Sequence, residues 1–354
     1  MCTCRKTPFF SRHISLTRNS PHISDSDLHK LAVATRRRQR QAFRPGTITN
    51  HRSQITLYLA FCIYYQLQDI NPEVATMCMY CEFLARSFNS PKAIHNYVSG
   101  VRLLHKYVHV DSPSLHAFEL DLILRSLNIT MRHIPNQRLP ISVAMLHQLI
   151  TLCNSLGHLG LVLKCAILLG YFGFLRQSNL APASHHAFDP TRHTCRADVI
   201  YHPPPGLVII LKWTKTMQSS SRTHLVPIPA ISHHPLCPVQ AFRDMDTALP
   251  APAPNSPLLL LTDRQNRLVP LGLDKLNKAF KVLISSAGYS SDQYSFHSLR
   301  RSGATTSYHA GIDFTHIKRH GAWNSDAFWE YISADATQSP VPKALADVVT
   351  AYQP

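Results

Sequence analysis

The sequence predicts a mainly α-helical protein with a small β-hairpin, arranged in two domains. Apolar residues recur every three or four positions through residues 44–133 and again in most of residues 141–335, as they do along buried helix faces. Residues 134–140 lie between these regions and contain two prolines, which favour an extended linker. Near residue 206 the pattern changes to two β-branched, apolar runs around a polar turn, which predicts the hairpin.

The composition indicates a globular protein that binds a polyanion. The chain has 354 residues, enough for two domains of ordinary size, and 45% of them are hydrophobic. Its 36 Lys and Arg residues against 20 Asp and Glu give a net charge of +16, with a pI near 9.6. Such an excess of positive charge makes nucleic acid the expected partner.

The cysteines and the apolar runs predict a protein of a reducing compartment with no membrane segment. The nine cysteines are odd in number and scattered, and the N-terminus lacks the apolar core and cleavage site of a signal peptide. The longest apolar run, Leu159 to Leu175, contains Lys164 and is shorter than the ~20 residues of a spanning helix, so we expect it to be a buried helix. We expect a nuclear protein if the source is a eukaryote, and otherwise one of the cytoplasm or nucleoid.

The first 43 residues form a basic N-terminal arm. Residues 1–44 hold ten Lys and Arg but two Asp, which is half of the net charge in an eighth of the chain. No apolar period is clear in residues 1–43, so we expect this arm to be disordered. Its "RRRQR" run has three interpretations: a solvated tail, a nuclear import signal or an arm that contacts DNA through Arg36, Arg37, Arg38 and Arg40.

Residues 44–133 read as a small all-helical domain. Its first helix begins near Thr47, and a second follows Asn71 and Pro72. A third has Ser90 as its N-cap and Pro91 at the first helical position, and a fourth spans Leu115 to Leu127. The basic residues expected to contact DNA on this domain are Lys92, Arg102 and Lys106.

Residues 141–335 read as the second domain, followed by a C-terminal tail at residues 336–354. Two helices open it, at Val143 to Ser155 and Leu159 to Phe174. "GLVIILKWTKT", the polar turn "QSSSR" and "THLVPIP" then predict the hairpin. After the proline-rich stretch at residues 249–257, the pattern predicts helices as far as about Ile332.

The stretch "FHSLRRSGATTSYHAGIDFTHIKRHGAWNSDAFWEYI" concentrates residues that bind and attack phosphate. His297 and Arg300 share one face of a helix that begins near Ser295. Glycines end this helix and a short second one, which leaves Trp323 at a bend, and a last helix would deliver Tyr331. Short helices that fold back on each other could bring these four side chains together.

This set of residues suits transfer of a phosphoryl group of DNA. A tyrosine hydroxyl has a pKa of about 10 and needs cationic or hydrogen-bonding neighbours before it becomes a good nucleophile. Guanidinium groups bind the non-bridging oxygens of a phosphate bidentately and stay charged. Arg300 and Arg176 are the candidates for this role, and a lysine could protonate the leaving 5′ oxygen.

The ordered set resembles the tyrosine recombinases, the phage-integrase-like family. The family pattern is Arg, Lys, His-x-x-Arg, His or Trp, then Tyr, and the matching segments here are "GYFGFLRQSNL", "WTKT", "HSLR" and "GAWNSDAFWEYI". The resemblance implies that Arg176 and Arg300 stabilise charge, that Lys215 is the general acid, that His297 and Trp323 position the phosphate and that Tyr331 is the nucleophile. Arg301 beside them reads as a phosphate contact or a surface charge.

The resemblance extends over roughly residues 44–335. Its style is closest to recombinases of eukaryotic mobile elements, of the DIRS and Crypton types, through "GAWNSDAFWEYI" and "HHPLCPVQAF". It implies a helical core-binding (SAM-like) domain followed by a mixed α/β catalytic domain. It also implies a site-specific recombinase or integrase that forms a 3′-phosphotyrosyl bond with double-stranded DNA as a homotetramer, without metal, ATP or a small-molecule substrate.

Two features of the site leave alternatives open. The family usually has Glu or Asp three residues after the first arginine, and here the residue is Asn179, which can accept a hydrogen bond but adds no charge. A decayed protein that binds DNA without cutting it therefore remains an alternative, as does a monomeric enzyme of the type IB topoisomerase class. Lys212 is a rival to Lys215, and an odd spacing puts the two on opposite faces of a strand.

A metal site is the main competing class of site. Cys78 and Cys81 form a C-x-x-C, and the chain has 22 histidines. No second C-x-x-C or matched histidine pair has zinc spacing, and the two cysteines fall in a helical apolar pattern where cysteine is a small hydrophobe. Nor does the sequence contain a Walker or dinucleotide glycine motif, so we expect no cofactor.

Overall fold

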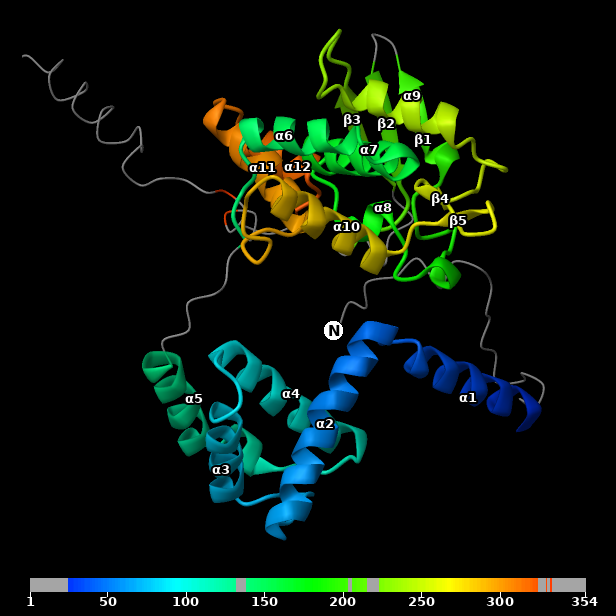
Figure 1. The fold of residues 1–354 in the computed structure, drawn as a ribbon. Coiled ribbons are helices and arrows are strands. Elements are labelled where there is room, and N and C mark those ends of the chain that lie inside the picture. Colours follow the sequence, from blue (N-terminus) through cyan, green and yellow to red (C-terminus); the bar gives the residue numbers. More distant parts are fainter. Residues whose placement is uncertain are drawn as a thin grey trace, which may run out of the picture. The chain divides into compact units, whose positions relative to one another are not determined.

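The chain divides into two compact units, Met1–Pro135 and Asn136–Pro354. The computed structural model (Figure 1) describes residues 25–131, 138–202, 206–214 and 223–323, together with Trp329 and Ile332. The division falls inside the predicted linker at residues 134–140. None of the helices in these described ranges is long and apolar enough to cross a membrane.

The first unit is helical, as predicted. Helices α2, α3, α4 and α5 enclose a core that includes Tyr58, Tyr80 and Val98, and a 3-10 turn precedes α5. Ser90 is the N-cap residue of α4 and Pro91 opens that helix, as the sequence indicated. The helices of this unit are α1 (Asp25–Arg40), α2 (Pro45–Tyr65), α3 (Val74–Ala85), α4 (Pro91–Tyr107) and α5 (Phe118–Thr130).

Helix α1 corrects the expectation of a disordered arm for residues 25–40, and residues 1–24 lie outside the described residues. Residues 25–40 are helical although the sequence of residues 1–43 shows no clear apolar period. The reason is local: acidic residues lie near the N-terminus of α1 and arginines near its C-terminus, and both placements stabilise a helix dipole. Leu28 and Leu31 remain exposed on this helix.

The second unit is built around α7, which is buried along almost its whole length. Helices α6, α9, α10 and α11 pack against it, as do strands β3 and β4. The longest apolar run of the sequence, which the sequence analysis predicted to be a buried helix, thus forms most of the buried helix α7. The helices of this unit are α6 (Val143–Cys153), α7 (Gly157–Phe172), α8 (Gln177–Leu180), α9 (Pro238–Ala248), α10 (Leu273–Ser286), α11 (Phe296–His309) and α12 (Phe314–His320).

The predicted hairpin is β2 (Gly206–Leu211) paired with β3 (His224–Pro229), antiparallel, with Ile209 opposite Val226. The sequence did not indicate β1 (Val199–His202), which adds to β2 and completes a sheet of order β1-β2-β3.

The expectation of continuous helix after residue 257 is wrong at a second hairpin, β4 (Leu260–Thr262) and β5 (Leu268–Pro270). Strands of three residues are too short for their alternation to be seen in sequence. What fixes them is the turn between them, where Asp263 accepts hydrogen bonds from the backbone of Gln265 and Arg267.

Gly303 allows α11 to approach α7 closely. A Cβ atom at this position would lie 2.2 Å from the Tyr171 carbonyl oxygen and 2.5 Å from the Phe174 ring. The Tyr171 hydroxyl donates to Thr306 Oγ1 (2.9 Å), which joins the same two helices one turn further on. This contact sets the position of the helix that carries His297 and Arg300.

We therefore expect Gly303→Ala to lower the free energy of unfolding of the second unit by about 2 kcal/mol, because the added methyl group meets backbone that cannot move aside. All three tryptophans of the chain, Trp213, Trp323 and Trp329, belong to this unit, so urea unfolding followed by tryptophan fluorescence reports on it selectively. Ser307→Ala on the same helix is the control. An equal stability of the two variants would contradict the packing argument.

Candidate active site

Arg300 lies at the centre of the candidate site and is almost fully buried, with 2% of its surface exposed. Its Nη1 donates to the Phe174 carbonyl, and its Nη2 donates to the Gly321 carbonyl at 2.6 Å. The guanidinium carbon lies 3.7 Å from the centroid of the Trp323 ring, which is a close cation–π contact. Helix α11 thus brings two residues of the predicted set, Arg300 and Trp323, into contact.

Both turns that meet Arg300 contain a non-glycine residue in the left-handed region. Phe174 (φ 48°) follows the end of α7, and Ala322 (φ 51°) follows the end of α12. Such conformations carry a strain energy and persist where surrounding contacts fix them. Gly321 leaves room for the Trp323 ring, since a Cβ atom there would lie 1.7 Å from it.

Arg176 and His297 face a common hollow of about 490 Å³. Arg176 is half-buried at the N-terminus of α8, and His297 is exposed in the first turn of α11. Arg176 and Arg300 also border one very small cavity, so the two arginines are neighbours. The structure therefore brings together four of the six residues predicted to be catalytic.

Lys215 and Tyr331 lie outside the described residues, but their neighbours in sequence do not. Thr214 is buried and borders the small cavity shared by the two arginines. Ile332 is buried in a cluster with Phe174 and Trp323.

Asn179 is buried and makes hydrogen bonds in two directions. Its Oδ1 accepts from the backbone N–H of Arg176 (3.1 Å), and its Nδ2 donates to the carbonyl of Trp213 (3.3 Å). The sequence indicated that this amide can accept a hydrogen bond. The bond that forms is to the backbone of Arg176, and the second bond reaches the segment after β2.

Lys212 has a structural role. Its Nζ forms an ion pair with Asp198 (2.7 Å) and contacts the Cys195 sulfur (3.4 Å). Burial lowers the pKa of Lys212, but the hydrogen bond and charge of Asp198 outweigh it, so the pKa is raised overall. A lysine held in this way is a poor proton donor, which favours Lys215 as the general acid.

The basic residues predicted to contact DNA lie in several places. Arg36, Arg37 and Arg38 are exposed on α1, and the side chain of Arg40 is outside the described residues. Arg301 is half-buried on α11.

Lys92 is exposed in the first turn of α4, and Lys106 and Arg102 border a polar hollow of about 400 Å³ between α2 and α4. His51, Gln54, Asn96 and Ser99 line the same hollow, and these hydrogen-bonding side chains were not singled out from the sequence. Arg102 also donates to the Leu115 carbonyl (3.0 Å), so part of its donor capacity is used inside the unit.

Helix α10 adds residues to the hollow beside Arg176 and His297. Asn277 and Lys281 line it together with the buried Phe280, and Leu276 of the same helix is buried in the core. The signal was present in the sequence, because lysines and apolar residues alternate at helical spacing from Lys275 to Lys281. The hollow therefore combines arginine, lysine, histidine and amide donors, a set that suits an anion.

His320 and His224 connect the site to its surroundings. His320 Nε2 donates to the Phe172 carbonyl (2.8 Å), and its ring meets that of Phe174 edge-on at 4.6 Å. His224 Nε2 donates to the His320 carbonyl (3.1 Å). Burial lowers the pKa of His320, and the charges of His224 and Arg300 lower it further, although the bond to Phe172 opposes this.

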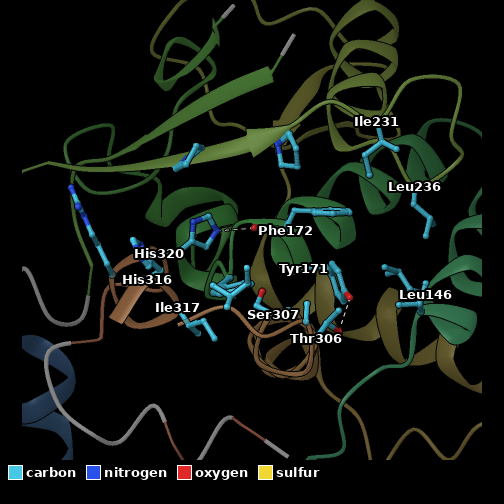
Figure 2. Close-up of a pocket in the computed structure, with 18 of the residues that line it drawn as sticks. Leu146, Tyr171, Phe172, Ile231, Leu236, Thr306, Ser307, His316, Ile317 and His320 are labelled. Carbon is cyan, nitrogen blue, oxygen red and sulfur yellow. Dashed lines mark hydrogen bonds between the residues drawn. The ribbon is translucent and has the colours of Figure 1, made fainter. Parts of the chain in front are cut away.

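An apolar groove of about 1100 Å³ adjoins the site (Figure 2). Leu146, Ile231 and Leu236 lie at one end of it, and His316 and His320 lie at the other. Strand β3 forms one wall, and Phe174 and His320 border both the groove and the small cavity beside Arg300.

Cys78 and Cys81 lie on α3, where Cys81 is fully buried and burial raises its pKa to about 12. Cys81 belongs to the hydrophobic core of the first unit, as the helical pattern indicated, whereas Cys78 is half-buried beside it. Within the ranges that the structure describes, no three His, Cys, Asp or Glu side chains are grouped closely enough to hold a metal ion.

The lowered pKa of His320 predicts a loss of stability in acid. A histidine that is neutral in the folded state contributes stability above its unfolded pKa of about 6.5, and this contribution is lost as the pH falls through the lower folded value. We expect the thermal midpoint of the second unit, followed by tryptophan fluorescence, to fall between pH 7 and pH 5. His320→Gln keeps a donor but does not titrate, so its midpoint should fall less; parallel curves would contradict this role.

Comparisons with known proteins show which fold this is. No protein-family model matches the chain, and no curated protein does. Among solved structures, the Tn1549 transposon integrase in complex with transposon right end DNA matches with a TM-score of 0.55 at 14% identity, over 90% of this chain and 97% of that one. The XerH site-specific recombinase bound to a palindromic difH substrate matches with a TM-score of 0.53 at 15% identity, over 77% and 69%. The chain therefore has the fold of the tyrosine recombinases and integrases.

Proposed function

We propose that the protein is a site-specific DNA recombinase or integrase that acts through a 3′-phosphotyrosyl intermediate. The observation that carries the proposal is the convergence of Arg176, His297, Arg300 and Trp323 on one site in a chain with this fold. These residues come from segments up to about 150 positions apart in the sequence. Residues so far apart in the sequence meet at one site, and they follow the order of the motif that the sequence resembles.

In the proposed reaction, the Tyr331 hydroxyl gives its proton to solvent, its oxygen attacks the scissile phosphorus and the bond to the 5′ oxygen breaks. Arg176 and Arg300 stabilise the charge on the non-bridging oxygens, and His297 and Trp323 position the phosphate. The ammonium of Lys215 gives its proton to the leaving 5′ oxygen and becomes a neutral amine. The 5′ hydroxyl of a second strand then attacks the phosphotyrosine and gives its proton to the Lys215 amine, and the released tyrosine oxygen takes a proton from solvent. This restores the tyrosine, the ammonium and a phosphodiester, so the chemistry consumes no ATP and needs no metal.

The state of Asn179 supports an active enzyme over a decayed one. A decayed site relaxes around a lost residue, whereas here the amide is buried and both of its polar atoms are hydrogen-bonded. The basic residues of α1 and the helical unit would supply phosphate contacts. We extend the proposal to a mobile element of the DIRS or Crypton type and, in a eukaryote, to nuclear import through the run at residues 36–40.

We expect Tyr331→Phe to abolish a covalent protein–DNA adduct that the wild type forms. The substrate is a pool of end-labelled random duplexes with nicks, because the short cleaved fragment diffuses away and prevents reversal. After denaturation, the wild type should show a DNA-linked band and the Phe variant should show none, since the phenyl ring has no nucleophilic oxygen.

Each of the other possible results of this experiment would indicate a different nucleophile or a different function. A band that persists in Tyr331→Phe means that another residue is the nucleophile. Salt-dependent DNA binding with no band in the wild type indicates the decayed DNA-binding protein. Relaxation of supercoiled DNA by protein too dilute to pair indicates the topoisomerase class.

We further propose that protomers assemble through the apolar groove, which receives residues 336–354 of a neighbouring copy. That segment lies outside the described residues, and its sequence spaces Leu345, Val348 and Tyr352 three or four apart, as on one helix face. Pro227 and Pro229 lie on β3 at the edge of the sheet, where they remove the N–H groups that an added strand would need. A helix fits such a groove better than a strand.

Removal of residues 336–354 should abolish complexes that join two DNA duplexes, while the covalent adduct on a single nicked site persists. Leu225→Asp should have the same effect, because Leu225 is exposed on β3 and borders the groove. Native gels of protein with two labelled duplexes measure both properties.

Leu122→Asp is the matched control, since Leu122 is also an exposed leucine but lies on α5 of the other unit. If the tail deletion still pairs duplexes as well as the wild type does, the groove is not the acceptor of this segment.

A further inference from the structure

Helix α10 forms one side of the hollow that Arg176 and His297 line. Asn277 and Lys281 border the hollow from this helix. They are four residues apart, so they lie on one face of α10, about 6 Å apart along its axis. Asn277 is half-buried and Lys281 is exposed. The hollow thus has hydrogen-bond donors from α10 in addition to the arginine and histidine of the candidate site.

A pair of buried rings fixes α10 against the helix that carries His297. Phe280 directly precedes Lys281, and Phe296 directly precedes His297. Both phenylalanines are fully buried, and their ring centroids lie 5.3 Å apart. The backbone origins of Lys281 and His297 are therefore held in a constant relation to each other, although both side chains reach the solvent.

The space around Lys281 is larger than a single phosphate group needs. The hollow beside Arg176 and His297 has a volume of about 490 Å³, that of about 16 water molecules at about 30 Å³ each. Lys281 also borders a second hollow, of about 480 Å³, in which Ser285 and Ser291 supply hydroxyl groups. Lys281 thus lies where the hollow of the candidate site and a second polar hollow meet.

Lys281 differs in this respect from the other lysines of α10. Lys275 and Lys278 are exposed but border neither of these two hollows. Lys281 Nζ lies 3.8 Å from Asp292 Oδ1, with 48% and 91% of the two side chains exposed. An exposed ion pair of this length is weak, so a phosphate can replace the carboxylate as the partner of Lys281.

We propose that Lys281 and Asn277 bind a second phosphate of the DNA, a neighbour of the scissile phosphate on the same strand. The inference rests on the proposed function, in which Arg176 and His297 hold the scissile phosphate itself. An ammonium group binds phosphate as a point charge, and the Asn277 amide adds an uncharged donor. Neighbouring phosphates of one strand advance only ~3.4 Å along the duplex axis, so a ligand that fills the hollow brings both.

The second phosphate has a distinct effect on the reaction. Contacts to phosphates set the register and orientation of a protein on its duplex without reading the bases. A single bound phosphate leaves the strand free to turn about it, whereas two bound neighbours fix the direction in which the strand runs through the site. Lys281 and Asn277 are therefore binding residues that orient the scissile phosphate for attack.

The test is a double-substitution cycle between the full-length protein and its DNA. The DNA is an intact duplex with the site that the wild type cleaves, and each phosphate within two positions of the scissile one is replaced, one at a time, by an uncharged methylphosphonate. Fluorescence anisotropy gives the Kd of each duplex for the wild type, Lys281→Gln and Asn277→Ala. Lys281→Arg keeps the charge, and Lys278→Gln makes the same change on the same helix outside both hollows.

On unmodified DNA we expect Lys281→Gln to bind about fivefold more weakly than the wild type, and Asn277→Ala about threefold. At one neighbour of the scissile phosphate, the methylphosphonate should weaken the wild type by about fivefold but Lys281→Gln by less than about twofold, because that contact is already lost. Asn277→Ala should couple to the same position. Lys281→Arg and Lys278→Gln should bind every duplex as the wild type does.

Three results would overturn the inference. Equal losses for the wild type and Lys281→Gln at every methylphosphonate mean that Lys281 contacts none of these phosphates. Coupling at the scissile phosphate alone means that the hollow binds one phosphate and not two. A loss for Lys278→Gln as large as that for Lys281→Gln means that the overall charge of α10 is what the DNA senses.

Failure of the proposed function gives a different result. A wild type that forms no covalent adduct overturns that function, and the salt dependence of binding to a random duplex then tests Lys281. The slope of log K against log salt should become shallower by about 0.9 in Lys281→Gln and stay the same in Lys278→Gln, as for the loss of one phosphate contact. An unchanged slope in Lys281→Gln, or no DNA binding by the wild type, overturns the inference as well.

Discussion

The buried guanidinium of Arg300 is the interaction on which the rest of the site depends. A charge with 2% exposure is costly unless its donors are satisfied, and here two of them bind the carbonyls of Phe174 and Gly321. Those carbonyls belong to turns at the ends of α7 and α12, each beside a residue in the left-handed region. One side chain thus holds two strained turns together and places Trp323 against its own face.

The two arginines differ in how completely the protein encloses their side chains. Arg300 is enclosed by backbone and by the Trp323 ring, so its direction is fixed before any ligand arrives. Arg176 is half-buried at the edge of the hollow that His297, Asn277 and Lys281 also line. In the proposed reaction, donors that are held in place in this way need little reorganisation when negative charge develops on the phosphate, which is the main source of electrostatic catalysis.

Around these arginines, side chains that carry no negative charge fix the backbone and leave the arginine charges for a ligand. Asn179 and His224 bind carbonyls, and His320 binds another with a lowered pKa that keeps it uncharged near neutral pH. An acidic residue at any of these points would compete with an anionic ligand for the arginines. Lys212 is the contrasting case, since its ion pair with Asp198 fixes the β-sheet and withdraws this lysine from the site.

The sequence by itself determined the mainly helical class, the β2–β3 hairpin and the order of the candidate residues, because helical spacing, caps and a long ordered motif are local or sequential signals. It did not reveal α1 as a helix or the β4–β5 hairpin, where the decisive contacts are charges at helix ends and hydrogen bonds within one five-residue loop. Only the tertiary structure decided that Arg300 is buried against two turns, that Lys212 is occupied by Asp198 and that Asn179 joins Arg176 to Trp213. Those contacts link residues 14 to 126 positions apart, and no periodicity in a chain records which distant groups folding will bring within hydrogen-bond distance.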